Sequence, residues 1–157
     1  MAKEFSFADL NKEMSKISEY GNTLDKSTIS EIDHYIPTGN YHLNACLTGS
    51  LFGGYPNNRA VALAGPSGTG KTYLILNAIK QAQRQGYSII FYDSENAVDK
   101  SLVEKFGIDA SKFRYEPCNT VQEFRSSVTA ITDVLIEQKK KGIALPKIMV
   151  VLDSAGN

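Results

Sequence analysis

Apolar side chains along this chain follow two different spacings. Residues 87–92 and 147–152 are nearly continuous apolar runs, as expected for strands that are buried on both faces of a parallel sheet. Between these runs, apolar residues recur every three to four positions, which is helical spacing. It predicts helices over residues 71–85, 99–106 and 120–141. Strands that alternate with helices predict an α/β protein with a parallel sheet flanked by helices.

Weaker patterns complete the expected core. Residues 59–64 form a short apolar run that predicts the first core strand, and residues 113–116 predict a less regular one. A short helix is expected around residues 43–47, after the turn-forming residues 36–39.

Several expected helix ends carry residue types suited to them. Asp99 and Thr120 each precede a predicted helix and are typical N-caps, and Glu123 completes a capping box with Thr120. Gly86 follows the helix over residues 71–85, where glycine adopts the left-handed conformation at low cost.

An amphipathic helix is predicted at residues 5–18. Ser6 is its expected N-cap, and Asp9 stands three positions later as a capping-box variant. One face of this helix is apolar, and it consists of Phe7, Leu10, Met14 and Ile17. A polar stretch follows, so residues 1–34 are expected to be a helix on a tether and residues 35–157 the core. These residues alone leave two alternatives for the helix. It packs on its own core, or it docks on a neighbouring subunit.

A glycine-rich loop precedes the helix over residues 71–85. It fits the pattern G-x-x-x-x-G-K-[ST] and consists of Gly65, Pro66, Ser67, Gly68, Thr69, Gly70, Lys71 and Thr72. Its glycines let main-chain N–H groups close around phosphate oxygens, and the helix dipole favours the same anion. Lys71 is expected to reach the β and γ phosphates, and the Thr72 hydroxyl to ligate Mg²⁺. The alternative is a glycine-rich turn that binds nothing, and the order strand, loop, helix favours the phosphate site.

Two carboxylates follow predicted strands. Asp153 ends the apolar run 147–152, which is the Walker B pattern of a magnesium-holding aspartate, with a turn or cap residue as the alternative. Glu95 lies just past the run 87–92, at the edge where open α/β sheets bind ligands. A carboxylate there can polarise an attacking water, although the residues alone favour an exposed loop glutamate.

Composition narrows the class of protein. The 157 residues carry 17 Lys and Arg against 17 Asp and Glu, so no overall field attracts nucleic acid or a membrane surface. A local basic patch is compatible with this equal number of basic and acidic residues. Cys46 and Cys118 lie far apart in sequence, which favours a reduced, intracellular protein. No apolar run is long enough to span a bilayer.

Four stretches together resemble the RecA family of recombinases, and most closely the UvsX-type recombinases of large tailed phages. Residues 36–39 with 43–47 resemble the segment that leads into the family's core, and residues 64–72 resemble its phosphate loop. Residues 91–95 resemble its glutamate strand, and residues 150–157 resemble its Walker B end. The Asp-Ser-x-Gly-Asn ending is the UvsX-like part, and the resemblance covers nearly all of the chain from about residue 30.

The resemblance implies an ATPase core with ATP and Mg²⁺, working in filaments on single-stranded DNA that carry out homologous pairing and strand exchange. It assigns water activation to Glu95, phosphate and metal contacts to Lys71 and Thr72, and a second metal contact to Asp153. It also favours docking of the N-terminal helix on the adjacent subunit. Asp99 matches a position that meets adenine in the family, while Leu102 stands where the family has a stacking aromatic.

The family's DNA-binding loops and γ-phosphate sensor follow its Walker B strand. The resemblance therefore predicts that this chain is the C-terminally truncated, N-terminal part of a recombinase and is inactive alone. It would act in the cytoplasm, of an infected bacterial host if phage-encoded, without a membrane partner. A helicase-type RecA-like motor and a non-catalytic module that joins or caps recombinase filaments are the alternative functions.

Overall fold

The computed structural model describes residues 5–18, 21, 23–26 and 31–154. In chain order the elements are α1 (Phe7–Ile17), η1 (Leu24–Lys26), β1 (Tyr35–Ile36), α2 (Tyr41–Thr48), β2 (Tyr55–Pro56), α3 (Lys71–Arg84), β3 (Tyr87–Asp93), α4 (Lys100–Lys105), η2 (Ala110–Lys112), β4 (Phe113–Pro117), α5 (Val121–Lys140) and β5 (Lys147–Asp153). Within these residues, three parallel strands form one sheet in the order β4-β3-β5. The predicted α/β architecture with a parallel sheet and helices is therefore confirmed.

Strand β3 is the centre of the sheet and of the core. It pairs in parallel with β4 on one side and β5 on the other, and Asp93 lies in register with Pro117 and Asp153. Ile89, Phe91 and Tyr92 are almost completely buried, which explains the nearly continuous apolar run. Because the strands are in register, their carboxyl ends meet at one edge of the sheet.

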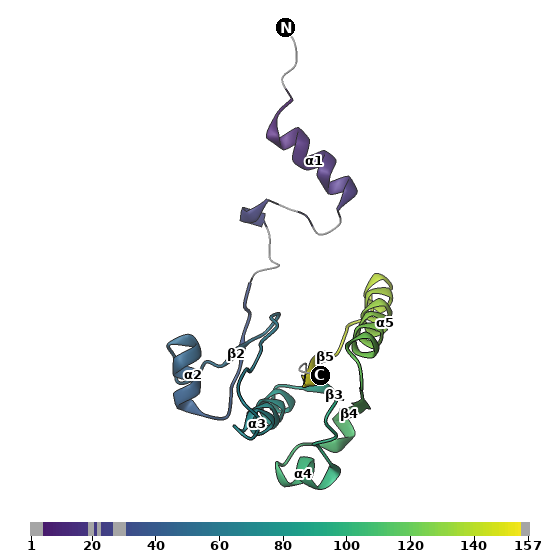
Figure 1. Ribbon diagram of the computed structural model, residues 1–157. Coiled ribbons are helices and arrows are strands. Elements are labelled where there is room, and N and C mark those ends of the chain that lie inside the picture. The colour runs from purple at the N-terminus through teal and green to yellow at the C-terminus, as the bar shows by residue number, and fades with distance from the viewer. Residues whose placement is uncertain (1–4, 19–20, 22, 27–30, 155–157) are drawn as a thin grey trace.

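Helices α3 and α5 lie on opposite sides of the strands (Figure 1). Helix α3 buries Leu76, Ile79 and Ala82, which recur three residues apart and so share the face that packs on the sheet. On the other side, the Tyr92 ring meets Phe124 of α5 edge to face at 5.0 Å. The Tyr92 hydroxyl and Ser127 Oγ are 2.7 Å apart, which fixes α5 against β3.

The first part of the core contains a short two-stranded pairing, and Ile36 of β1 packs into the main hydrophobic core. Strands β1 and β2 pair antiparallel, a hairpin-like pairing that the apolar pattern did not predict because each strand has two residues. The buried Asn44 side chain accepts hydrogen bonds from the N–H and Oγ1 of Thr38 at 2.9 and 2.8 Å. The Gln85 side chain donates to the Tyr35 carbonyl at 3.0 Å, which ties β1 to the end of α3.

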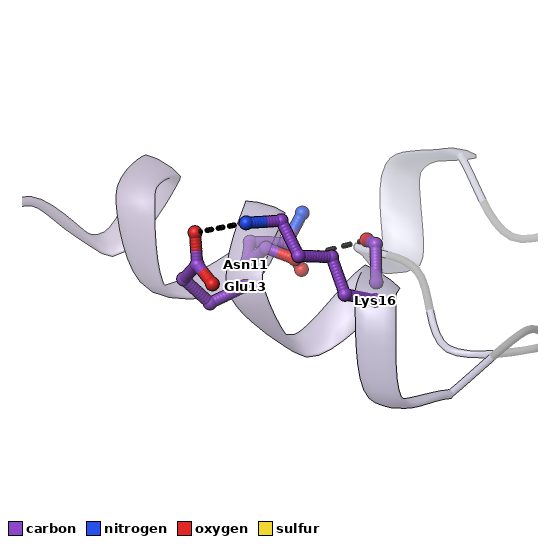
Figure 2. Close-up of polar contacts among 4 residues, drawn as sticks. Asn11, Glu13 and Lys16 are labelled. Atoms are coloured by element: carbon purple, nitrogen blue, oxygen red, sulfur yellow. Dashed lines mark hydrogen bonds and ion pairs between the residues drawn. The ribbon is translucent and has the colours of Figure 1, made fainter.

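Helix α1 stands away from the core in Figure 1 and buries none of its residues. Its predicted capping box is confirmed, since Asp9 N–H donates to Ser6 Oγ and Ser6 N–H donates to an Asp9 carboxylate oxygen. Exposed polar contacts run along its surface, including the Lys16–Glu13 ion pair at 2.6 Å and the bond from the Ser15 hydroxyl to the Asn11 carbonyl (Figure 2). The alternative in which α1 packs on its own core is therefore not observed in the described residues.

The predicted core strand over residues 59–64 is wrong. Residues 60–66 have no regular secondary structure, and Val61 is 48% exposed. A strand is stable only where a neighbour takes up its N–H and C=O groups, and β5, at the edge of the described sheet, does not pair with this segment. The apolar pattern predicted burial that these side chains do not have, because a pattern of side chains does not show whether a hydrogen-bonding partner is present.

The other helix ends agree with the expectations to within two or three residues. Asp99 caps α4 through a 2.7 Å bond from Leu102 N–H, and Thr120 caps α5 through a bond from Glu123 N–H. The Glu123 carboxylate accepts from Asn119 N–H, one residue earlier than a standard capping box requires. Across the described ranges, no helix combines the length and the apolar character needed to cross a bilayer.

Candidate functional site

The glycine-rich loop ends where α3 begins. Gly68 and Gly70 have φ values of 76° and 88°, a region that side chains with a Cβ atom rarely adopt. Gly70 is the N-cap of α3 and supplies no side-chain oxygen to the first turn of the helix. The N–H groups of that turn are therefore available to an anion, and the dipole of this 14-residue helix favours one there.

Lys71 brings a positive charge to the same place. Its ammonium donates to the carbonyl oxygens of Gly65 and Pro66, both at 2.9 Å, so the side chain folds back over the loop. Thr69 Oγ1 donates to the Pro66 carbonyl at 2.8 Å and tightens the turn. An ammonium on exposed carbonyl oxygens can exchange these weak neutral acceptors for charged phosphate oxygens, because charge-assisted hydrogen bonds are stronger.

Thr72 and Asp153 lie side by side although 81 residues separate them. The Thr72 hydroxyl donates to an Asp153 carboxylate oxygen at 2.7 Å, and Asp153 is only 6% exposed. Thr72 belongs to the first turn of α3, and Asp153 ends β5, so the packing of α3 on the sheet brings the two together. Hydroxyl and carboxylate oxygens are the hard ligands that Mg²⁺ prefers, and the residues present fit the metal expected here.

Glu95 lies at the same edge, one strand away. Its exposed carboxylate accepts a 2.8 Å hydrogen bond from the Ser154 hydroxyl, directly after Asp153. The Ser94 hydroxyl both accepts from Ser154 N–H and donates to the Ser154 carbonyl at 3.0 Å. These bonds join the ends of β3 and β5 and so bring the glutamate-bearing loop beside the Thr72–Asp153 pair.

Sequence reasoning assigned no role to Asp93, which the structure buries at this edge to 1% exposure. Its carboxylate accepts from the N–H groups of Glu95 and Val98 at 3.0 and 3.1 Å, and from the Tyr115 hydroxyl at 3.1 Å. An aspartate that ends a buried strand was the signal used for Asp153, and the same signal would have found Asp93.

Asp99 both caps a helix and borders a cavity. Its carboxylate accepts Leu102 N–H as the cap of α4, and it borders a cavity of about 360 Å³ under that helix. The cavity is lined by Val98, Asp99, Lys100, Val103, Ala110, Phe113 and Tyr115. The predicted adenine contact of Asp99 stays a prediction.

Fold and site together define an α/β protein with a candidate ligand site at the carboxyl edge of a parallel sheet, beside a helix N-terminus. The family model for the RecA N-terminal domain matches residues 3–153. The chain therefore belongs to the RecA family.

Curated relatives agree with this family. The chain is 32% identical to Protein RecA of Lactobacillus delbrueckii subsp. bulgaricus over 127 residues, which is 78% of this chain and 38% of that protein. It is 34% identical to Protein RecA of Acholeplasma laidlawii over 110 residues, or 69% of this chain and 31% of that protein. Over 74 residues it is 42% identical to Protein RecA of Bacteroides thetaiotaomicron, covering 47% of this chain and 22% of the relative. The matched region thus spans less than two fifths of each of these relatives.

Proposed function

We propose that this chain is the ATP-binding, N-terminal part of an ATP-dependent recombinase that forms filaments on single-stranded DNA and promotes homologous pairing and strand exchange. The observation that carries the proposal is the 2.7 Å contact between Thr72 and Asp153 at the mouth of the glycine-rich loop. It joins the two residues expected to hold a metal, beside a helix N-terminus suited to phosphate.

In this proposal the loop residues 65–72 hold the phosphates of ATP. Main-chain N–H groups and the Lys71 ammonium contact phosphate oxygens, and Lys71 leaves the carbonyl oxygens of Gly65 and Pro66 to do so. Thr72 and Asp153 hold Mg²⁺, which when bound neutralises charge on the phosphates. The Thr72–Asp153 hydrogen bond keeps both oxygens at one point beside the loop.

Glu95 activates the attacking water. Its carboxylate orients the water toward the γ-phosphate and accepts a proton as the new oxygen–phosphorus bond forms and the bond to ADP breaks. Ser154 donates to this carboxylate at 2.8 Å and holds it at the sheet edge. Glu95 is exposed, so water reaches it freely.

We further propose the division into an N-terminal docking helix with its linker, residues 1–34, and a core, residues 35–157. The apolar side chains of α1 support it, since Phe7 is 73% and Ile17 is 88% exposed. In this proposal these side chains dock on the core of an adjacent subunit, as the resemblance implies.

The phage type and the cytoplasmic location are finer parts of the same proposal. The phage type rests on the UvsX-like pattern from Asp153 to Asn157 alone, whereas the relatives described above are bacterial RecA proteins. The cytoplasmic location rests on Cys46 and Cys118, which lie far apart in sequence. Sequencing the gene neighbourhood tests the phage origin.

Electron microscopy of the gene product on single-stranded DNA tests the main proposal. With ATP and Mg²⁺ we expect regular filaments, and without nucleotide we expect few. Discrete rings under both conditions favour the helicase-type motor. Protein that decorates the ends of added recombinase filaments without binding ATP favours the non-catalytic module.

A further inference from the structure

The loop that carries Glu95 is shaped by one buried carboxylate. Asp93 Oδ1 accepts the N–H of Glu95 at 3.0 Å, and Oδ2 accepts the N–H of Val98 at 3.1 Å. The two N–H groups lie on either side of the turn, so Asp93 determines the path of the main chain that bears the Glu95 side chain. Between them, Asn96 has a positive φ of 53°, the left-handed conformation that asparagine adopts more readily than most residues with a Cβ atom.

Tyr115 reaches the same carboxylate from the neighbouring strand β4. Its hydroxyl donates to Asp93 Oδ2 at 3.1 Å and lies 3.4 Å from Oδ1 of Asn96. Tyr115 therefore contacts both Asp93, which holds the loop, and Asn96 in the middle of the loop. Tyr115 is 38% exposed, and its strand β4 lies on the opposite side of β3 from β5.

We infer that Tyr115 is a positioning residue for Glu95, acting through Asp93 to hold the β3–α4 loop in the arrangement that presents the glutamate. The inference rests on the proposed function, because the role of Glu95 is proposed there. Tyr115 touches no reacting atom. Its hydroxyl fixes the rotation of the Asp93 carboxylate, and this carboxylate in turn fixes the N–H groups of Glu95 and Val98.

The ionisation of Tyr115 is consistent with a permanent donor. Burial, and then the hydrogen bond and the negative charge of Asp93, raise the pKa of the Tyr115 hydroxyl above its ordinary value. The group therefore keeps its proton at neutral pH.

Tyr115→Phe tests the inference by removing the hydroxyl and keeping the ring. The matched control is Tyr92→Phe in β3, which removes a 2.7 Å contact to Ser127 of α5 and none of the hydrogen bonds of the Asp93 carboxylate. Hydrogen exchange of the amides of Glu95 and Val98, measured by NMR on the 157-residue chain, reports the loop directly. We expect exchange about tenfold faster in Tyr115→Phe, as for a lost hydrogen bond to a charged group, and no change at these amides in Tyr92→Phe.

Catalysis supplies the second readout, in a recombinase that carries this chain at its N-terminus. Tyr115→Phe should lower kcat about tenfold and leave KM for ATP unchanged, because a displaced loop misplaces Glu95 without touching the phosphate site. Unchanged amide exchange together with unchanged kcat overturns the inference. If the parent protein binds and hydrolyses no ATP, the proposed function fails, and the amide exchange still decides whether Tyr115 holds the loop.

Discussion

Lys71 shows how a single side chain connects the structure to the proposed activity. Its ammonium lies 2.9 Å from two carbonyl oxygens of its own loop, so its charge lies at the proposed phosphate site. These carbonyls are neutral acceptors, and a phosphate oxygen is a stronger partner. Gly68 and Gly70 allow the main chain of the loop to turn, while Lys71 provides its positive charge.

We expect Lys71→Ala to abolish productive ATP binding, with an affinity loss of at least about 100-fold, because the loop loses its positive charge. Isothermal titration with ATP and Mg²⁺ measures it. Lys80→Ala, on the same helix but away from the loop, is the control and should bind like the parent chain. Equal affinity in all three proteins would remove the phosphate-site assignment.

Glu95→Gln should leave nucleotide affinity nearly intact and slow hydrolysis by about 100-fold in a recombinase that carries this chain, as for a lost general base. The amide keeps the size of the side chain and a hydrogen bond with Ser154, so the loop stays in place. Single-turnover phosphate release measures the rate. Glu104→Gln, an exposed change on α4, is the control, and a parental rate in Glu95→Gln would make Glu95 only a loop residue.

At the scale of the element, helix α1 and the segment 60–66 show opposite outcomes of the same local reasoning. Helix α1 forms as predicted because its capping box and its internal ion pair lie within the helix itself. The segment 60–66 forms no strand because strand pairing needs partners from elsewhere in the chain. A helix satisfies its own backbone, whereas a strand does not.

Deleting residues 1–20 should weaken self-association without unfolding the core, since α1 buries nothing against it. Light scattering on a recombinase that carries this chain measures filament length, and the thermal unfolding midpoint of the core checks that it stays folded. A quadruple change of Glu13, Lys16, Lys12 and Asn11 to alanine is the control, because it leaves the apolar face intact. Unchanged filament length after the deletion would show that α1 has no role in docking.

At the scale of the whole molecule, charge balance decides what the chain attracts. Seventeen positive and 17 negative side chains give a formal net charge of zero. Affinity for nucleic acid that comes from release of counterions requires a concentration of Lys and Arg, and this balance does not supply one overall. Residues 112–115 alternate basic and aromatic side chains, but Phe113 stacks on Phe91 inside the protein and Arg114 pairs with Glu116, so this short run is not an open stacking surface for single-stranded bases.

The 157-residue chain alone should therefore bind single-stranded DNA only weakly and show no DNA-stimulated ATP hydrolysis. Fluorescence anisotropy with a labelled oligonucleotide at about 0.15 M salt measures binding near physiological ionic strength. A second titration at about 0.02 M salt is the control, and a small salt effect is expected for a chain of zero net charge. Submicromolar binding with DNA-stimulated phosphate release would place a working DNA site inside these residues.

Much of the candidate site was predictable because its signals are local. The glycine spacing of residues 65–72, the start of a helix at Lys71, and the aspartate at the end of β5 all follow from short stretches of sequence. The caps Ser6, Asp99 and Thr120 were predictable for the same reason, since each bonds a backbone group three residues away.

The amino-acid sequence by itself therefore determined the helices, the strands β3 and β5 and the position of the glycine-rich loop, because periodicity, capping and glycine conformation act over a few residues. It did not determine how deeply β5 is buried, since Val150 is 44% exposed although the apolar run predicted burial on both faces. Only the tertiary structure decided which distant side chains meet. It brought Thr72 to Asp153, joined Glu95 to Ser154, and turned Asp93 and Tyr115 into supports of one loop. Those contacts depend on strand register and on the packing of α3, and these arise from hydrogen bonds between strands and from burial of apolar faces far apart in the chain.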